Sequence, residues 1–207
     1  MDLKRAPHMQ AQLLLQEYLD LWSIQPGVRL IGLLATALFI GSMIIQSEVN
    51  VKRGLGLANL FAAAHLFGIG ATVAAWRSII AFVRLFLGAA SNLSTAKRMG
   101  AVTLFTALYL VIFLLSYKQH ADYLALCGTL VNTAASLLLT GIRFRTALVM
   151  GSSLWLGYDL LVGAYEIAVA TFLGLAAGVY ALRREMKAIE KDSTRKNHET
   201  TSARAVL

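Results

Sequence analysis

Residues 54–90 read GLGLANLFAAAHLFGIGATVAAWRSIIAFVRLFLGAA, and this stretch decides the fold. As one helix it would be roughly 50 Å long, because an α-helix rises about 1.5 Å per residue. The hydrocarbon layer of a bilayer is about 30 Å thick, so a single crossing does not need this length. Gly68 and Gly70 interrupt the apolar pattern near its centre. The stretch therefore predicts two membrane spans, 54–71 and 73–90, joined by a tight turn.

The rest of the chain has the same apolar character. Of its 207 residues, 57% are hydrophobic and 14% charged, whereas soluble domains have about 45–50% and about 25%. This composition excludes intrinsic disorder, and a lone cysteine, Cys127, excludes a disulfide-stapled fold. Windows of about 17–25 apolar residues predict an all-α, polytopic membrane protein with seven spans. They cover residues 29–46, 54–71, 73–90, 99–116, 123–140, 146–163 and 164–182.

The two tight turns resemble each other. His65 stands five residues before Gly70, Tyr158 stands five residues before Gly163, and in both places the chain enters the next span at once. Two such three-helix units separated by one linker span would have the same orientation in the membrane. The pattern predicts a 3+1+3 bundle. Repeat 1 covers about 29–90, the linker about 99–116 and repeat 2 about 123–182.

Two segments flank the spans. Residues 1–28 contain an amphipathic stretch that ends at Pro26-Gly27, which predicts a short helix lying in the membrane interface; a disordered tail is the alternative. Residues 183–207 mix Glu and Lys at helical spacing and then lose all periodicity. This pattern predicts a helix extension followed by a disordered, basic cytoplasmic tail.

The positive charges predict the orientation. Thirteen of the 19 Lys and Arg residues fall on one side of the predicted spans, five fall on the other, and Arg84 lies within a span. Because basic loops stay in the cytoplasm, the N-terminus is expected outside and the C-terminus inside. The net charge of +8 is thus mainly a topology signal. Nucleic acid is not an expected partner, since no folded basic surface with interleaved aromatics is present.

Polar residues inside the spans are the candidate functional residues. A charge at the bilayer centre costs about 2.5–3.5 kcal/mol, so it usually faces a partner or a wet cavity. We expect Arg84 to attract an anionic or hydroxyl-rich group and Asp159 to balance it or carry a proton. The candidate solute-binding residues are His65, Arg84, Asn132, Trp155, Tyr158 and Asp159.

The sequence lacks the motifs of several common enzyme and cofactor-binding classes. No Gly-rich phosphate loop precedes a basic helix, no His/Cys/Asp/Glu cluster has metal-ligand spacing, and no Gly-x-Ser-x-Gly elbow is present. We therefore expect neither a cofactor nor an enzyme. An intramembrane acid–base pair of His65 and Asp159 stays open as an alternative.

Three further segments are HLFGIGATVAAWRSIIAFVR from His65, GTLVNTAASL from Gly128 and WLGYDLLVG from Trp155. They resemble the YgjV-type bacterial inner-membrane proteins, which belong with the SWEET and MtN3-like sugar carriers and the nicotinamide riboside carriers. The resemblance runs from the first span to the seventh. It implies a 3+1+3 bundle in the bacterial inner membrane with its N-terminus outside, and a transport role through distant relatives alone.

The leading hypothesis is a carrier or facilitator of a small polar solute that works by alternating access. The alternative is a structural or regulatory membrane protein whose buried charges fix how the helices dock. The expected partners are the lipid bilayer and an unknown solute, and the sequence leaves a homo-oligomer open.

Overall fold

The computed structural model describes residues 26–90 and 93–205, apart from the side chains of Glu166 and of residues 192–205. The described chain is helical, and each predicted span corresponds to one helix. The helices are α2 (Pro26–Ile44), α3 (Glu48–Gly68), α4 (Thr72–Ala89), α5 (Thr95–Ser116), α6 (Asp122–Leu138), α7 (Gly141–Leu161) and α8 (Tyr165–Ala205). The predicted interfacial helix falls before residue 26 and so lies outside the described residues.

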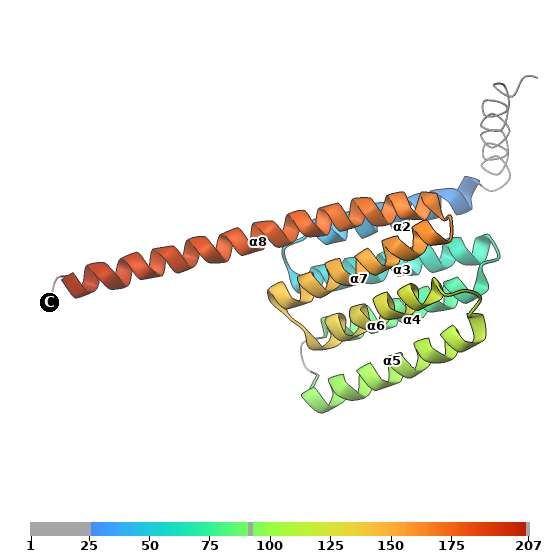
Figure 1. Ribbon diagram of the computed structural model, residues 1–207, viewed down its shortest axis with the longest axis horizontal. Helices are drawn as coiled ribbons and strands as arrows, with labels where there is room; N and C mark the ends of the chain where they lie inside the picture. The colour runs from blue at the N-terminus through green and yellow to red at the C-terminus, as the bar shows by residue number, and fades with distance from the viewer. Residues whose placement is uncertain (1–25, 91–92, 206–207) are drawn as a thin grey trace, which may run out of the picture.

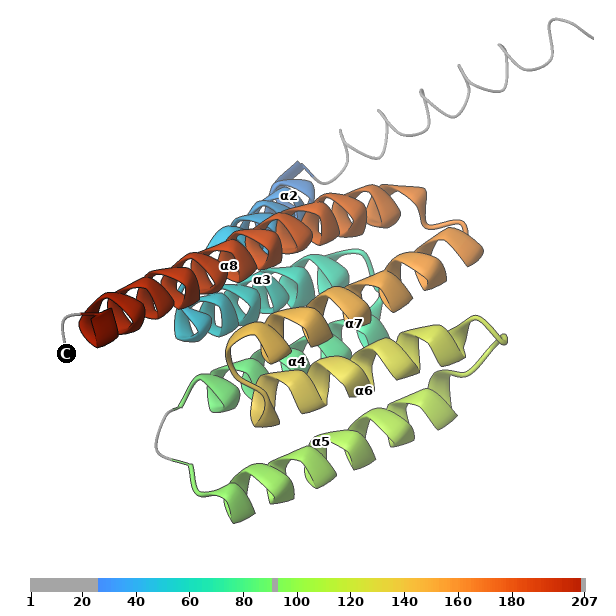
Figure 2. The same ribbon diagram turned by 60° about the vertical axis from the view of Figure 1, so that its left-hand side comes forward.

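The helices lie in two layers of three. In the first layer α3 packs between α2 and α4, and in the second α7 packs between α6 and α8 (Figure 1). The layers meet where α2 contacts α8 and α4 contacts α6, and α5 lies along the edge formed by α4 and α6 (Figure 2). The α2 helix begins at one end of the bundle and α8 leaves from the other (Figure 1).

The turns of the two hairpins have matching hydrogen bonds. In the α3–α4 turn the N–H groups of Ile69, Gly70 and Ala71 donate to the carbonyls of His65, Phe67 and Leu66. In the α7–α8 turn those of Val162, Gly163 and Ala164 donate to Tyr158, Leu160 and Asp159. The turn glycines have φ angles of +78° and +75°, a conformation that glycine adopts without strain. A glycine is therefore required at both positions.

The outward surface of the bundle is apolar. Leu104, Val111, Leu114 and Leu115 on α5 are more than half exposed, which in water would make an unusually large apolar patch. Four of the described helices, α2, α4, α5 and the Ile167–Lys191 part of α8, are long and apolar enough to cross a membrane. Their length and apolar surface are those expected of membrane-spanning helices.

The core lies between the layers. Met43 of α2, Val51 and Leu55 of α3, and Phe144 of α7 pack together in it and are almost fully buried. Small residues allow the layers to approach. A Cβ atom on Gly88 of α4 would overlap the carbonyl oxygen of Ser136 on α6. The close α4–α6 contact therefore depends on a residue without a side chain.

Helix α2 is described from Pro26, three residues before the predicted start of the first span. One prediction was wrong. The tail after residue 183 does not lose its helix, because α8 continues to Ala205. No glycine or proline interrupts this segment, and it contains Ala, Glu, Lys and Arg, which favour helix.

Candidate functional site

A cavity of about 570 Å³ lies at the end of the bundle that carries the α3–α4 turn and the α5–α6 loop. Its wall comes from α4, α5, α6 and the last turn of α7, so elements of both layers and α5 line it. The polar residues in the wall include Arg77, Tyr109, Lys118, Asp122, Thr129 and Tyr158.

An aromatic pair holds Arg77 on the wall of the cavity. The guanidinium carbon of Arg77 lies 4.8 Å from the centre of the Trp155 ring, a cation–π distance. The ring of Trp155 meets that of Tyr158 edge to face, with ring centres 5.6 Å apart. One turn of α7 thus positions the charge of an α4 residue beside the space that a solute could fill.

Arg84 lies behind the wall and is 5% exposed. Its Nη1 donates to Oγ1 of Thr133 at 2.6 Å and to the carbonyl of Thr129 at 3.3 Å. The guanidinium carbon lies 5.7 Å from the centre of the Tyr109 ring. Because Tyr109 and Thr129 both line the cavity, the charge of Arg84 is separated from it by one layer of side chains.

Asp122 lies in the wall of the cavity and binds the α5–α6 loop. Its Oδ2 accepts hydrogen bonds from the backbone N–H groups of Lys118 at 2.7 Å and Gln119 at 3.0 Å. The carboxylate therefore fixes the α5–α6 loop just before α6 begins.

The other candidates bind neighbouring helices away from the cavity. Nδ1 of His65 lies 2.8 Å from the carbonyl oxygen of Val28, which joins α3 to α2. Oδ2 of Asp159 accepts a hydrogen bond of 2.8 Å from Thr171, which joins α7 to α8. Asn132 packs on Gly151, where α6 meets α7. No described hydrogen bond or ion pair joins Asp159 to an arginine.

Of the six predicted site residues, the structure brings three together. Tyr158 lines the cavity, Trp155 packs against Tyr158, and Arg84 lies behind the part of the wall that contains Tyr109, whereas His65, Asn132 and Asp159 lie elsewhere. Arg77, Tyr109, Lys118 and Asp122 line the cavity but were not among the predicted site residues. A signal existed for Arg77, which stands one heptad before Arg84 on α4 and so shares its face.

The opposite end of the bundle is closed by ionic contacts. Lys52 of α3 is 2% exposed and donates to Oε1 of Glu48 at 2.7 Å and to the carbonyl of Gly88 at 3.2 Å. Oε2 of Glu48 accepts a hydrogen bond of 2.7 Å from the N–H of Gly141, at the start of α7. This one carboxylate therefore connects the two layers.

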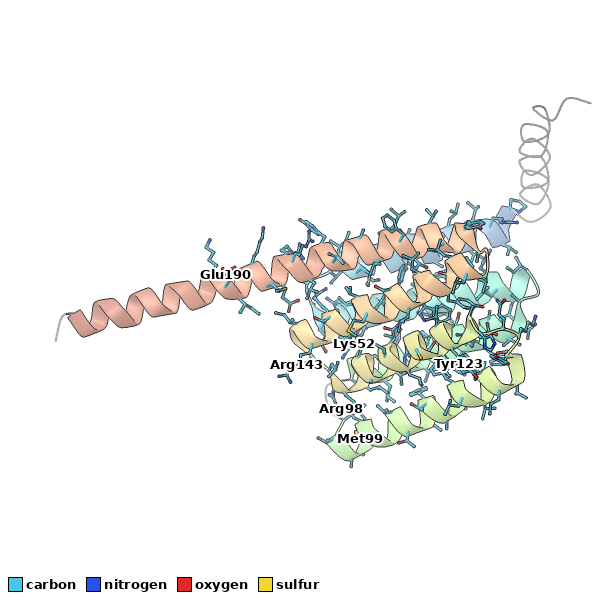
Figure 3. All side chains as sticks on the ribbon, in the orientation of Figure 1. Lys52, Arg98, Met99, Tyr123, Arg143 and Glu190 are labelled. Atoms are coloured by element: carbon cyan, nitrogen blue, oxygen red, sulfur yellow. The ribbon has the colours of Figure 1, made fainter. Side chains whose placement is uncertain are left out.

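Arg145 closes the same end by binding carbonyls that directly follow the last residue of α2. Nη2 of Arg145 donates to the carbonyls of Ile45 at 2.6 Å and Gln46 at 2.8 Å, and Nε of Arg145 pairs with Glu185 of α8. Such carbonyls have no partner within their own helix and carry partial negative charge. Figure 3 shows the basic side chains Lys52, Arg98 and Arg143 toward this end and Tyr123 at the other.

The apolar helices and the charged, closed end define an integral membrane protein made of packed helices. A family model described as a bacterial inner membrane protein, Imp-YgjV, matches residues 28–188. The chain therefore belongs to the Imp-YgjV family of bacterial inner membrane proteins. No curated protein and no solved structure matches it.

Proposed function

We propose that this protein carries or facilitates the passage of a small polar solute across the inner membrane. The observation that supports this proposal is the cavity of about 570 Å³, which is open at one end of the bundle and blocked toward the other by packed and ion-paired side chains. A pathway that is open at one end and closed at the other is what alternating access requires.

The proposal includes a 3+1+3 architecture in seven spans, as in SWEET-like carriers. A separation of 93 residues relates Glu48 to Gly141, which begin α3 and α7. The same separation relates the two turn glycines (163 − 70) and the starts of α4 and α8 (165 − 72). An alignment without gaps over two hairpins is expected of an internal repeat. Helix α5 then serves as the linker.

The proposed orientation places the N-terminus outside and the C-terminus in the cytoplasm. Lys52, Arg98, Arg143 and Arg145 all belong to the closed end, which the positive-inside rule assigns to the cytoplasm. The cavity then opens to the outside. Rocking of one layer against the other would break the contacts of Glu48 and Arg145 and open the cytoplasmic end.

A second candidate function, a structural or regulatory membrane protein, has its own supporting observation. His65, Arg84 and Asp159 each donate or accept a hydrogen bond that joins two helices. Buried polar contacts of this kind fix how helices dock, with or without a solute. Under this candidate the cavity would be a packing defect and no solute would cross.

Uptake into proteoliposomes tests the proposal. The purified chain is reconstituted and screened with radiolabelled sugars, nucleosides, amino acids and organic acids. Ala74 lines the cavity, so Ala74→Trp would fill it and is expected to abolish uptake of whichever solute the wild type accumulates.

A matched control uses the same substitution on α5. Ala107 is exposed on the outer surface, so Ala107→Trp is expected to leave uptake unchanged. Uptake that survives Ala74→Trp would show that this cavity is not the path. A wild-type protein that folds but moves none of the solutes would favour the structural candidate.

A further inference from the structure

Three positive charges surround the cavity, and one carboxylate, Asp122, is among the residues that line it. Arg77 and Lys118 line it, and Arg84 lies directly behind its wall. The salt bridges of Lys52 and Arg145 lie at the closed end. Around the cavity the three cations outnumber the one carboxylate of its wall, so positive charge is in excess there.

Two nearby carboxylates accept hydrogen bonds from groups other than these cations. Oδ2 of Asp122 accepts from two backbone N–H groups of its own loop, and Oδ2 of Asp159 accepts from Thr171. A guanidinium stays protonated at any physiological pH. In surroundings of low dielectric constant, an unbalanced cation is costly unless an anion approaches it.

Two buried polar atoms beside the cavity have no hydrogen-bond partner among the described residues. One is the hydroxyl of Tyr109, which is 4% exposed and belongs to a residue of the cavity wall. The other is Nε of Arg84, beneath the ring of Tyr109. Buried polar groups in native proteins are nearly always hydrogen-bonded. Because side chains separate Arg84 from the cavity, the hydroxyl of Tyr109 is the atom that a polar group of a ligand would complete.

We propose that the ligand of this cavity is a small organic anion bound through its carboxylate or phosphate oxygens; this inference rests on the proposed function for its transport role. The guanidinium of Arg77 and the hydroxyl of Tyr109 donate to the oxyanion, and Arg84 stabilises its charge from behind. Guanidinium groups bind both kinds of oxyanion in a bidentate manner.

The size and lining of the cavity favour an organic ion over an inorganic one. Its volume of about 570 Å³ lies within the roughly 300–1,000 Å³ that is usual for small-molecule sites. Ile112, Phe113 and Leu126 add an apolar section of wall, against which the carbon part of the anion can pack.

Tryptophan fluorescence of the full chain in phosphatidylcholine nanodiscs tests the proposal, because Trp155 contacts Arg77. The probes are succinate, glycerol 3-phosphate and, as a neutral control, ribose. Succinate, glycerol 3-phosphate or both are expected to cause a saturable change, and ribose none. The two anions distinguish a carboxylate site from a phosphate site. Arg77→Gln is expected to weaken anion binding by about 10- to 100-fold, the usual effect of losing hydrogen bonds to a charged group.

Arg53→Gln is the matched control, since Arg53 is exposed near the start of α3, at the closed end. The midpoint of thermal unfolding gives a second measurement, because an anion that binds the folded protein must raise it. Equal responses to ribose and to the anions, or Arg77→Gln titrating like the wild type, would overturn the proposal, as would anions that change neither signal.

A lipid headgroup is another source of the same oxyanion. Nanodiscs that contain phosphatidylglycerol test for this source. The lipid is the ligand if these nanodiscs raise the midpoint of thermal unfolding without free anion and Arg77→Gln removes the rise. The oxyanion site then stands, with lipid as its ligand. Anion binding without any uptake would contradict the transport proposal but not this site. Uptake of a neutral solute that Arg77→Gln leaves unchanged would contradict this site but not transport.

Discussion

Lys52 and Arg145 occupy the same position, the fifth residue, of two helices that are each 21 residues long. Both are buried at the closed end of the bundle, and both bind the third helix of their own layer, through Gly88 of α4 and Glu185 of α8. Two cations that a count of charges treats as loop residues are thus fixed parts of the packing.

Replacing Lys52 by Met should destabilise the protein. The substitution keeps the length of the side chain but leaves the carbonyl of Gly88 and one oxygen of Glu48 without their donor. We expect a loss of about 1–3 kcal/mol, the cost of leaving buried polar groups unpaired. Thermal unfolding in detergent measures it. Lys97→Met, at an exposed position of the same end, should change little, and equal effects of the two would refute the role of Lys52.

Arg145→Gln should also weaken the closed end. The shorter, neutral side chain cannot bind the carbonyls of Ile45 and Gln46 and pair with Glu185 at once. A loss of about 1.5–3 kcal/mol is expected for hydrogen bonds to a charged group. Arg143→Gln removes an exposed charge two residues away and serves as the control. Unfolding midpoints that move equally in both variants would show that net charge, rather than this contact, matters.

Gly88→Ala should separate α4 from α6. The new Cβ atom would overlap the backbone oxygen of Ser136, which cannot move without its helix. Overpacking of this kind costs about 1–3 kcal/mol. A Cβ on Gly100 of α5 meets no atom within 4 Å, so Gly100→Ala is expected to stabilise by about 0.4–1 kcal/mol. The two substitutions should therefore change the free energy of unfolding in opposite directions. A Gly88→Ala variant more stable than the wild type would contradict the close contact.

Cysteine labelling should place the two ends of the bundle on opposite sides of the membrane. After Cys127→Ser, we expect a membrane-impermeant maleimide to label Lys118→Cys in intact spheroplasts, because the α5–α6 loop is proposed to lie outside. Arg143→Cys should react after permeabilisation alone. Both positions are exposed in the structure, so labelling of both in intact spheroplasts would exclude the proposed topology.

Arg84→Met separates the two candidate functions. The carbonyl of Thr129 keeps a donor in this variant, because the hydroxyl of Thr133 also binds it. We therefore expect an unfolding midpoint close to that of the wild type. Uptake should fall by at least about tenfold, which corresponds to about 1.4 kcal/mol, because the charge that stabilises the anion from behind the wall is lost. A variant that loses its fold and its activity together would support the docking role instead.

The helices could be predicted from the sequence because lipid imposes a length and an apolar surface on each span. The turns at Gly70 and Gly163 followed from glycine in the middle of a run too long for one helix. The burial of Lys52 could not be predicted in the same way. Its acceptors include a backbone carbonyl, and such groups leave no signature in the sequence.

Only part of the site was predictable. The cost of burying a charge indicates that Arg84 must find partners, but the partner depends on how each helix is rotated about its axis. The sequence suggested Asp159, whereas the structure pairs Arg84 with Thr133 and stacks it over Tyr109. Tyr109 lies on α5, which contained none of the predicted site residues, although a tyrosine in the middle of an apolar span was the available signal.

Because α8 is long, a small tilt of the second layer moves the far end of this helix by a large distance. Its 41 residues extend over about 60 Å, twice the thickness of the hydrocarbon layer, so about half of the helix projects beyond it. A tilt of about 10° in the buried half would swing the distal tip by about 10 Å. A fluorophore attached near Ala205 would thereby convert a slight shift between the layers into a displacement large enough for energy-transfer distance measurements.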